Sequence, residues 1–280
     1  MVSEALDWLA IRPEGTYLDA TAGLGGHSRE IAGRLSTGRL IANDRDPETL
    51  EILKRNTAAY GGRIRHNLGR FSELEEALGN LGIARVDGLL ADLGASYYQL
   101  TDPERGFSFQ SESSLDMRMN RREGPTASEL VNTMSERDLA GLIGQLGERR
   151  PGKVARAIVR ARPYRTTRDL TRVIERVVPR TGRLDPATRT FLALRLAVNE
   201  ELEELDALLE AAPRLVRAGG RLVVIAFMSL EDVRVKRCFQ ALAREGRAKL
   251  LTKHVVRPTA EETRRNSPSR SARLRAVEMY

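Results

Sequence analysis

Short apolar runs alternate with segments of helical periodicity over the first hundred residues of the chain. Strands are expected at residues 17–19, at 39–43, near Ile64 and in VDGLLADLG, which closes at Asp92. Helices are expected at about 3–10, 27–35, 47–60 and 72–81. Because a helix separates each strand from the next, the strands should be mainly parallel and covered on both faces. The pattern predicts an α/β fold.

After Asp102 the chain becomes polar and loses its strands. Helical periodicity returns at about 136–146, 153–162 and 167–178, and Thr126 with Glu129 resembles a capping box. We therefore expect a helical insertion at 103–188 within a main domain formed by 1–102 and 189–280. The expected elements that follow are a long helix at 186–209, a strand at 219–227, a helix at 230–244, and two final strands at 250–258 and 271–279.

The charge balance favours a polyanionic partner. The 280 residues carry a formal net charge of +8, and basic residues gather at 118–122, 149–168 and 264–275. Arginine pairs with phosphate in a bidentate fork, so the clusters suggest nucleic acid, although a merely solvated basic surface is the alternative.

Cys238 is the only cysteine, which excludes an intramolecular disulfide and any multi-cysteine metal site, and we expect no metal. No run approaches the roughly 20 apolar residues of a membrane span, so a cytoplasmic location is expected.

The segment from Thr16 to Ser28 joins a short strand to a glycine-rich turn that opens a helix. Glycines allow the backbone to approach a ligand, and Asp44, at the end of the next strand, is placed to accept hydrogen bonds from ribose hydroxyls. The turn reads Gly23, Leu24, Gly25, Gly26 and departs from the G-x-G-x-x-G dinucleotide spacing. The turn is thus compatible with two kinds of ligand, adenosine with an amino acid tail or a pyrophosphate. A tight strand-to-helix connection with no ligand is the simpler alternative.

Five segments of the chain occur in an order that is typical of one family. They are DATAGLGGHS, NDRDP, DLGASYYQLTDPERGFSFQ with SLDMRMN, TRTFLALRLAVNEELEEL, and GGRLVVIAFMSLED. Together they closely resemble the bacterial 16S rRNA cytosine N4-methyltransferase family, also called RsmH or MraW. The resemblance implies a Rossmann-like S-adenosylmethionine-dependent methyltransferase fold with an inserted helical domain, S-adenosyl-L-methionine as the cofactor, and the 16S rRNA of the small ribosomal subunit as the partner. It also implies N4-methylation of a cytidine in the decoding region.

Position by position, the resemblance also implies a cofactor pocket. Its expected residues are Gly25, Gly26, His27, Asp44, Phe71, Asp92 and Gln99. An aromatic face at Phe71 offers stacking to adenine, and carboxylates can bind hydroxyls or the cofactor amine. Phe71 as ordinary core and His27 as a helix cap are the alternatives. Asp92 is the stronger candidate, because ligands of open α/β sheets bind at the carboxyl ends of strands.

Methyl transfer to an exocyclic amine needs an in-line approach and acceptors for the amine hydrogens. Other amino methyltransferases place a polar residue and an aromatic after the fourth strand. Ser96, Tyr97 and Tyr98 occupy that loop here. We therefore expect Asp92, Ser96 and Tyr98 to be catalytic and Tyr97 to contact the target base, with a tyrosine ring stacking on it. Surface tyrosines in a turn are the alternative.

A second group of candidate substrate contacts follows the last parallel strand. Ser229, Glu231 and Asp232 can hydrogen-bond a nucleotide, although Ser229 with Asp232 also makes an ordinary helix N-cap. Arg118, Asn199 and Arg273 are family-matching polar positions that hold RNA or, in the simpler interpretation, form contacts within the fold.

The chain departs from the family pattern at the expected base pocket. Met228 stands where the family has a histidine, and the chain has SYYQ where the family has S-S-P-Q. Pro151 falls where a helix is expected to continue. Three functions stay open: an active methyltransferase, an assembly factor that keeps the fold but transfers slowly or not at all, and, on the glycine turn alone, a nicotinamide-dependent oxidoreductase.

Overall fold

The computed structural model describes residues 1–110, 112–180 and 185–280, so the expected insertion at 103–188 includes positions 111 and 181–184 that lie outside the described residues. The chain divides into two compact units. The first unit consists of Met1–Gly94 and Leu202–Tyr280, and the second of Ala95–Glu201. Among the residues described, no helix is both long and apolar enough to cross a membrane.

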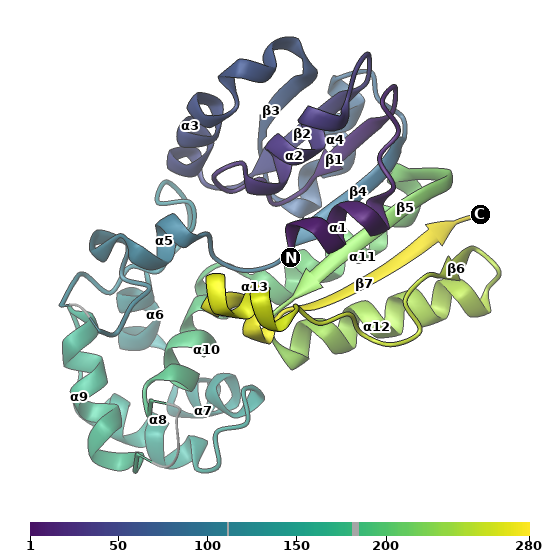
Figure 1. Cartoon of the computed structure of the whole chain (residues 1–280). Helices are drawn as coiled ribbons and strands as arrows, with labels where there is room; N and C mark the ends of the chain where they lie inside the picture. Colours follow the sequence, from purple (N-terminus) through teal and green to yellow (C-terminus); the bar gives the residue numbers. More distant parts are fainter. Residues whose placement is uncertain (111, 181–184) are drawn as a thin grey trace. The chain divides into compact units, whose positions relative to one another are not determined.

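The first unit is built on a seven-stranded sheet of order β3-β2-β1-β4-β5-β7-β6 (Figure 1). The strands are β1 (Thr16–Asp19), β2 (Arg39–Asp44), β3 (Ile64–Leu68), β4 (Val86–Asp92), β5 (Val216–Ala226), β6 (Ala248–Leu250) and β7 (Arg273–Met279). The five strands from β3 to β5 are parallel, and β7 runs antiparallel to both β5 and β6. The prediction of a mainly parallel, Rossmann-like sheet is confirmed.

Helices cover both faces of this sheet, as the apolar runs predict (Figure 1). On one face lie α4 (Leu74–Asn80), α11 (Glu201–Leu215) and α12 (Ser229–Arg244); on the other lie α1 (Val2–Leu9), α2 (Gly26–Arg34) and α3 (Pro47–Asn56). Successive strand residues point to opposite faces. Leu89 therefore packs in the first core and Leu90 in the second. The sheet is buried on both sides.

The second unit is helical and has a core of its own. Its helices are α5 (Tyr97–Thr101), α6 (Ala127–Thr133), α7 (Glu136–Gln145), α8 (Pro151–Arg160), α9 (Thr167–Val177) and α10 (Thr188–Val198). Thr126 and Glu129 form the expected capping box at the start of α6. Pro151 does not interrupt a helix: it stands in the first turn of α8, where its missing N–H costs no hydrogen bond.

Two expected elements differ in the structure. The helix expected at 186–209 is two helices, α10 and α11, because the chain turns at Glu200, whose φ is 50°. The strand expected at 250–258 is wrong apart from its first residue, since β6 ends at Leu250. Beyond that point the main-chain amide of Ala276 donates to the Thr252 hydroxyl, which ends the regular ladder, and Val256 forms only an isolated bridge with Leu274.

Candidate active site

The glycine turn leaves an open helix start at the carboxyl end of β1. Gly25 precedes α2 with a φ of 93°, and no side chain caps the helix. A Cβ on Gly25 would lie 2.9 Å from Leu53 Cδ1, whereas one on Gly26 would meet nothing within 4 Å. The first position therefore needs glycine for its own conformation and packing. The second leaves space beside the free amides of a helix N-terminus, which favour an electronegative ligand group.

Asp44 ends β2 and ties the glycine turn to it. One carboxylate oxygen accepts a 2.8 Å hydrogen bond from the Gly23 amide and the other a 2.9 Å bond from the Asp46 amide. Burial raises the pKa of Asp44 to about 6. A carboxylate offers about four acceptor sites, so this side chain can hold the turn and still accept from hydroxyl groups.

His27 and Asp92 bring buried polar atoms without partners to the same edge of the sheet. His27 Nδ1 lies 3.7 Å from Asp92 Oδ2, at the end of β4. His27 Nε2 and Asp92 Oδ1 are buried and have no hydrogen-bond partner. Burial raises the pKa of Asp92 to about 7 and lowers that of His27. Such atoms are rare in folded proteins, and a ligand with amine and hydroxyl groups would satisfy them.

Phe71 begins a short 3-10 turn, η2 (Phe71–Glu73), after β3. Its side chain is partly buried and packs against the core on the α4 and α11 face. The ring thus serves as core and also keeps exposed surface. Adenine stacking at Phe71 stays a prediction.

Ser96, Tyr97, Tyr98 and Gln99 lie in the second unit, at the start of α5. The Ser96 hydroxyl accepts from the Gln99 amide at 3.2 Å, and the Gln99 side chain accepts from the Ser96 amide at 2.8 Å. Helix capping therefore engages both residues. The Tyr98 ring faces the Arg105 guanidinium at 5.9 Å, while Tyr97 is 71% exposed. Of the two rings, Tyr97 has the surface that stacking on a base requires.

The segment from Phe227 to Asp232 starts α12, and its expected capping pattern is wrong. Ser229 is the first helical residue rather than the N-cap; the buried Glu231 side chain accepts from the amides of Phe227 and Met228 at 2.9 and 3.0 Å. A longer side chain three residues into the helix thus replaces the serine cap. Glu231 thus caps the N-terminus of α12, a structural role that the sequence analysis did not predict.

Asp232 is engaged in the same region. Its carboxylate receives two hydrogen bonds, of 2.6 and 3.1 Å, from Arg275. Arg273 donates to the Ser229 hydroxyl at 3.0 Å, in an exposed contact that a ligand can displace. The side chains of Ser229 and Arg273 are therefore more readily available to bind substrate than the Asp232 carboxylate is.

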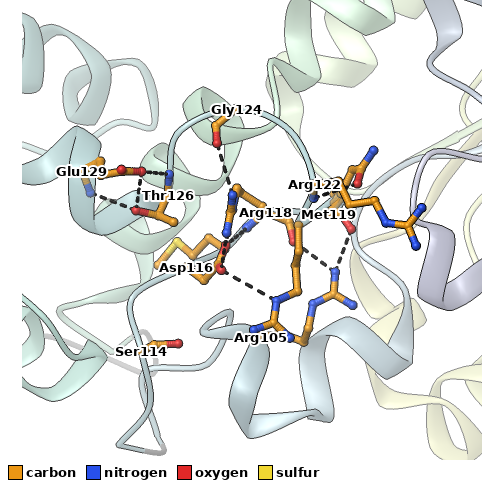
Figure 2. A network of polar contacts seen from close by, with 12 residues as sticks. Arg105, Ser114, Asp116, Arg118, Met119, Arg122, Gly124, Thr126 and Glu129 are labelled. Atoms are coloured by element: carbon orange, nitrogen blue, oxygen red, sulfur yellow. Dashed lines mark hydrogen bonds and ion pairs between the residues drawn. The ribbon is translucent and has the colours of Figure 1, made fainter.

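Arg118, in the second unit, is held by Asp116 (Figure 2). Its Nε and Nη2 atoms donate to the two carboxylate oxygens at 2.8 and 2.9 Å. Burial opposes ionisation of Asp116, yet these hydrogen bonds lower its pKa below the ordinary value. The contact within the fold, expected as the simpler role of Arg118, is present.

The comparisons with known proteins decide the family. Residues 1–280 match the model of the MraW methylase family. The chain belongs to the MraW methylase family. The resemblance drawn from the five motifs is confirmed, and the nicotinamide-dependent oxidoreductase alternative is wrong.

Curated relatives of this MraW methylase cover nearly its whole length. One from Solibacter usitatus is 56% identical over 280 residues, which are 100% of this chain and 98% of the relative. Another from Acidobacterium capsulatum is 46% identical over 286 residues, with 99% and 96% covered. Both are named ribosomal RNA small subunit methyltransferase H. Among solved structures, a putative rRNA methylase from Clostridium thermocellum has 10% identity and a TM-score of 0.49, with 99% of this chain and 96% of that one covered.

The MraW motif RGFSF with LDMRMN builds one loop, and sequence reasoning missed how. Arg105 is fully buried, and its Nη2 donates to the carbonyls of Arg118 and Met119 at 3.0 and 2.7 Å (Figure 2). From the other side, Asn199 accepts from the Met119 amide at 2.7 Å and donates to the Met117 carbonyl at 2.8 Å. Asn199 thus stabilises this loop through two main-chain hydrogen bonds.

Among the described residues, no group of three or more His, Cys, Asp or Glu is placed to hold a metal ion.

Proposed function

We propose that this chain transfers a methyl group from S-adenosyl-L-methionine to N4 of a cytidine in the decoding region of 16S rRNA, in the cytoplasm. The observation that carries the proposal is the pair of buried, unpartnered atoms, Asp92 Oδ1 and His27 Nε2, beside an open glycine turn. The 56% identical relative named ribosomal RNA small subunit methyltransferase H supports the substrate class.

The residues present fit S-adenosylmethionine. Asp44 offers acceptors for ribose hydroxyls, Phe71 offers a face to adenine, and Asp92 with His27 has the free acceptor capacity that the amino acid tail needs. Gly25 and Gly26 line the proposed pocket, and Gln99 stays a predicted cofactor contact. When bound, the cofactor supplies a methyl group made electrophilic by the sulfonium.

The proposed work of the chain is to orient the target amine and to accept its proton. The N4 lone pair of cytosine is delocalised into the ring, so an acceptor on the amine hydrogens makes it a better nucleophile. The Asp92 carboxylate suits this task, because a group whose pKa is about 7 accepts a proton near neutral pH. The new N–C bond would form as the methyl–sulfur bond breaks, with a neutral thioether as the leaving group. The amine would lose one proton to Asp92, and no covalent intermediate with the protein is needed. Ser96 and Tyr98 are the proposed polar partners in this step, with Tyr97 stacking on the base.

We also propose that residues 1–102 and 189–280 act as the methyltransferase domain and residues 103–188 as the RNA-recognition insertion. The exposed face of α8 supports this division. Lys153, Arg156 and Arg160 recur there at three- and four-residue spacing, all exposed, while Val154, Ala155 and Ile158 are buried. Residues at that spacing share one side of a helix. The result is a basic stripe suited to a phosphate backbone; Arg156 also pairs with Glu136 at 3.2 Å.

Reversing two charges of the basic stripe should weaken RNA binding. For Lys153→Glu with Arg160→Glu, we expect affinity for a 16S rRNA fragment to fall about tenfold or more, and the slope of log K against log salt to shrink by about 1.4 to 1.8. The matched control is Arg34→Glu with Arg39→Glu, an equal charge change at exposed positions of the first unit. Filter binding over a salt series measures both. Equal losses in the two double variants would show that net charge alone acts.

The proposed function is tested by incubating the protein with labelled S-adenosylmethionine and undermethylated small subunits or 16S rRNA, followed by mapping of the modified nucleotide. We expect one labelled cytidine, with the methyl group on N4. Calorimetry should show binding of S-adenosylmethionine and none of NAD. Cofactor and RNA binding without incorporation would instead favour the assembly-factor alternative, and label on another base would refute the N4 assignment.

A further inference from the structure

We propose that Glu204 is a positioning residue of the cofactor pocket, which acts by fixing the backbone that carries Phe71. This inference rests on the proposed function, because it takes Phe71 as the adenine contact. Glu204 lies on α11 and is only 8% exposed. Its carboxylate accepts from the Ser72 amide at 3.0 Å and from the Ser72 hydroxyl at 3.0 and 3.2 Å, and it lies 3.6 Å from Arg70 Nε. It thus contacts the residues on both sides of Phe71.

A second set of hydrogen bonds holds the backbone on the N-terminal side of Phe71. The Gly69 amide donates to the Asp44 carbonyl at 3.1 Å, and the Asn43 side chain donates to the Gly69 carbonyl at 3.1 Å. Gly69 is thereby tied to the end of β2, where Asp44 stands at the proposed ribose site. Phe71 lies between these hydrogen bonds and the Glu204 contact to Ser72. The proposed adenine and ribose contacts are therefore linked through a few residues of backbone.

The chemistry of the contact explains why a buried carboxylate is tolerated there. A charge removed from water is costly unless hydrogen bonds or an opposite charge stabilise it. Here the Ser72 amide and hydroxyl donate to the carboxylate, and Arg70 Nε lies 3.6 Å away as an ion-pair partner. Loss of the carboxylate would leave the Ser72 amide unpaired and free the turn to move. Phe71 would move with it.

The first test measures binding of S-adenosylmethionine, and separately of adenosine, by calorimetry. For Glu204→Ala we expect about tenfold weaker binding of both ligands, because a buried donor loses its charged acceptor. Glu204→Gln keeps an acceptor for Ser72 and should lose only about twofold to threefold. Glu203→Ala is the matched control, an exposed glutamate on the same helix, and should bind as the parent does. Unchanged affinity in Glu204→Ala would overturn the proposal. Ser72→Ala serves in its place if that variant does not fold.

The second test separates positioning from a general loss of structure. In a Phe71→Ala background, Glu204→Ala should cause no further loss of affinity, because the ring it positions is absent. Full additivity of the two losses would overturn the positioning role. If Phe71→Ala alone left binding unchanged, the proposed adenine contact itself would be wrong. If Phe71→Ala weakened binding while Glu204→Ala did not, only the positioning role would fail.

Discussion

Asp92→Ala is expected to lower kcat/KM for methyl transfer by about a thousandfold, the size of effect seen when a preorganised charge-stabilising group is removed. Asp92 has a buried Oδ1 without a partner and a pKa raised by burial to about 7, so it is poised to accept a proton. Asp92→Asn keeps the shape and should lose nearly as much. Methyl incorporation into small subunits measures both variants.

The pH dependence shows whether the loss comes from this carboxyl group. In the parent, kcat/KM should rise with pH and level off above about 7, because that quantity reports the free enzyme's ionisations. The Asp92→Asn profile should lack this step. The main-chain amide of Asp92 still donates to Thr21 in either variant, so the strand end stays in place. An unchanged turnover, or the same pH step in Asp92→Asn, would contradict the assignment.

The same pKa predicts the sign of a stability change. The folded-state pKa of Asp92 lies above its unfolded value, so folding disfavours the charged form. That penalty is absent below about pH 4, grows as pH rises, and is complete above about pH 7. Asp92→Asn should therefore raise the midpoint of thermal unfolding at pH 8 more than at pH 4. A gain in stability together with a loss of turnover is what a catalytic group held against its solvation preference should give.

Periodicity predicted most of the fold because burial on both faces leaves a direct mark on the sequence. The strand ending at Asp92 is a continuous apolar run, and such runs separated by helical segments fix a parallel sheet. Periodicity failed where a local side chain decides the outcome. Thr252 replaces a main-chain group in the ladder, and Glu200 adopts a left-handed conformation. Neither has a signal in the hydrophobic pattern.

The candidate site divides in the same way. The sheet topology places Asp44 and Asp92 at strand ends, and this placement could be predicted from the order of the elements. Arg105 and Glu204 could not, since their partners lie on segments whose contact depends on the fold. A glutamate in an amphipathic helix is ordinarily expected to face water.

Gly106→Ala is expected to destabilise the second unit by about 3 to 5 kcal/mol, because it adds a main-chain clash to an unfavourable backbone conformation. Gly106 has a φ of 71°, and a Cβ there would lie 2.3 Å from the Ser114 carbonyl oxygen and 2.8 Å from the Asp116 amide nitrogen. Both are main-chain atoms, so the loop held by Arg105 must shift as a whole. Urea unfolding followed by circular dichroism measures the loss.

Gly147→Ala separates the clash from the cost of the backbone conformation. Gly147 lies in the same unit with a φ of 75°, but a Cβ there would meet nothing within 4 Å. Only the left-handed conformation is penalised, by about 1 to 2 kcal/mol. The difference between the two variants is therefore the cost of displacing the Ser114–Asp116 main chain. Equal losses would mean that this loop yields easily.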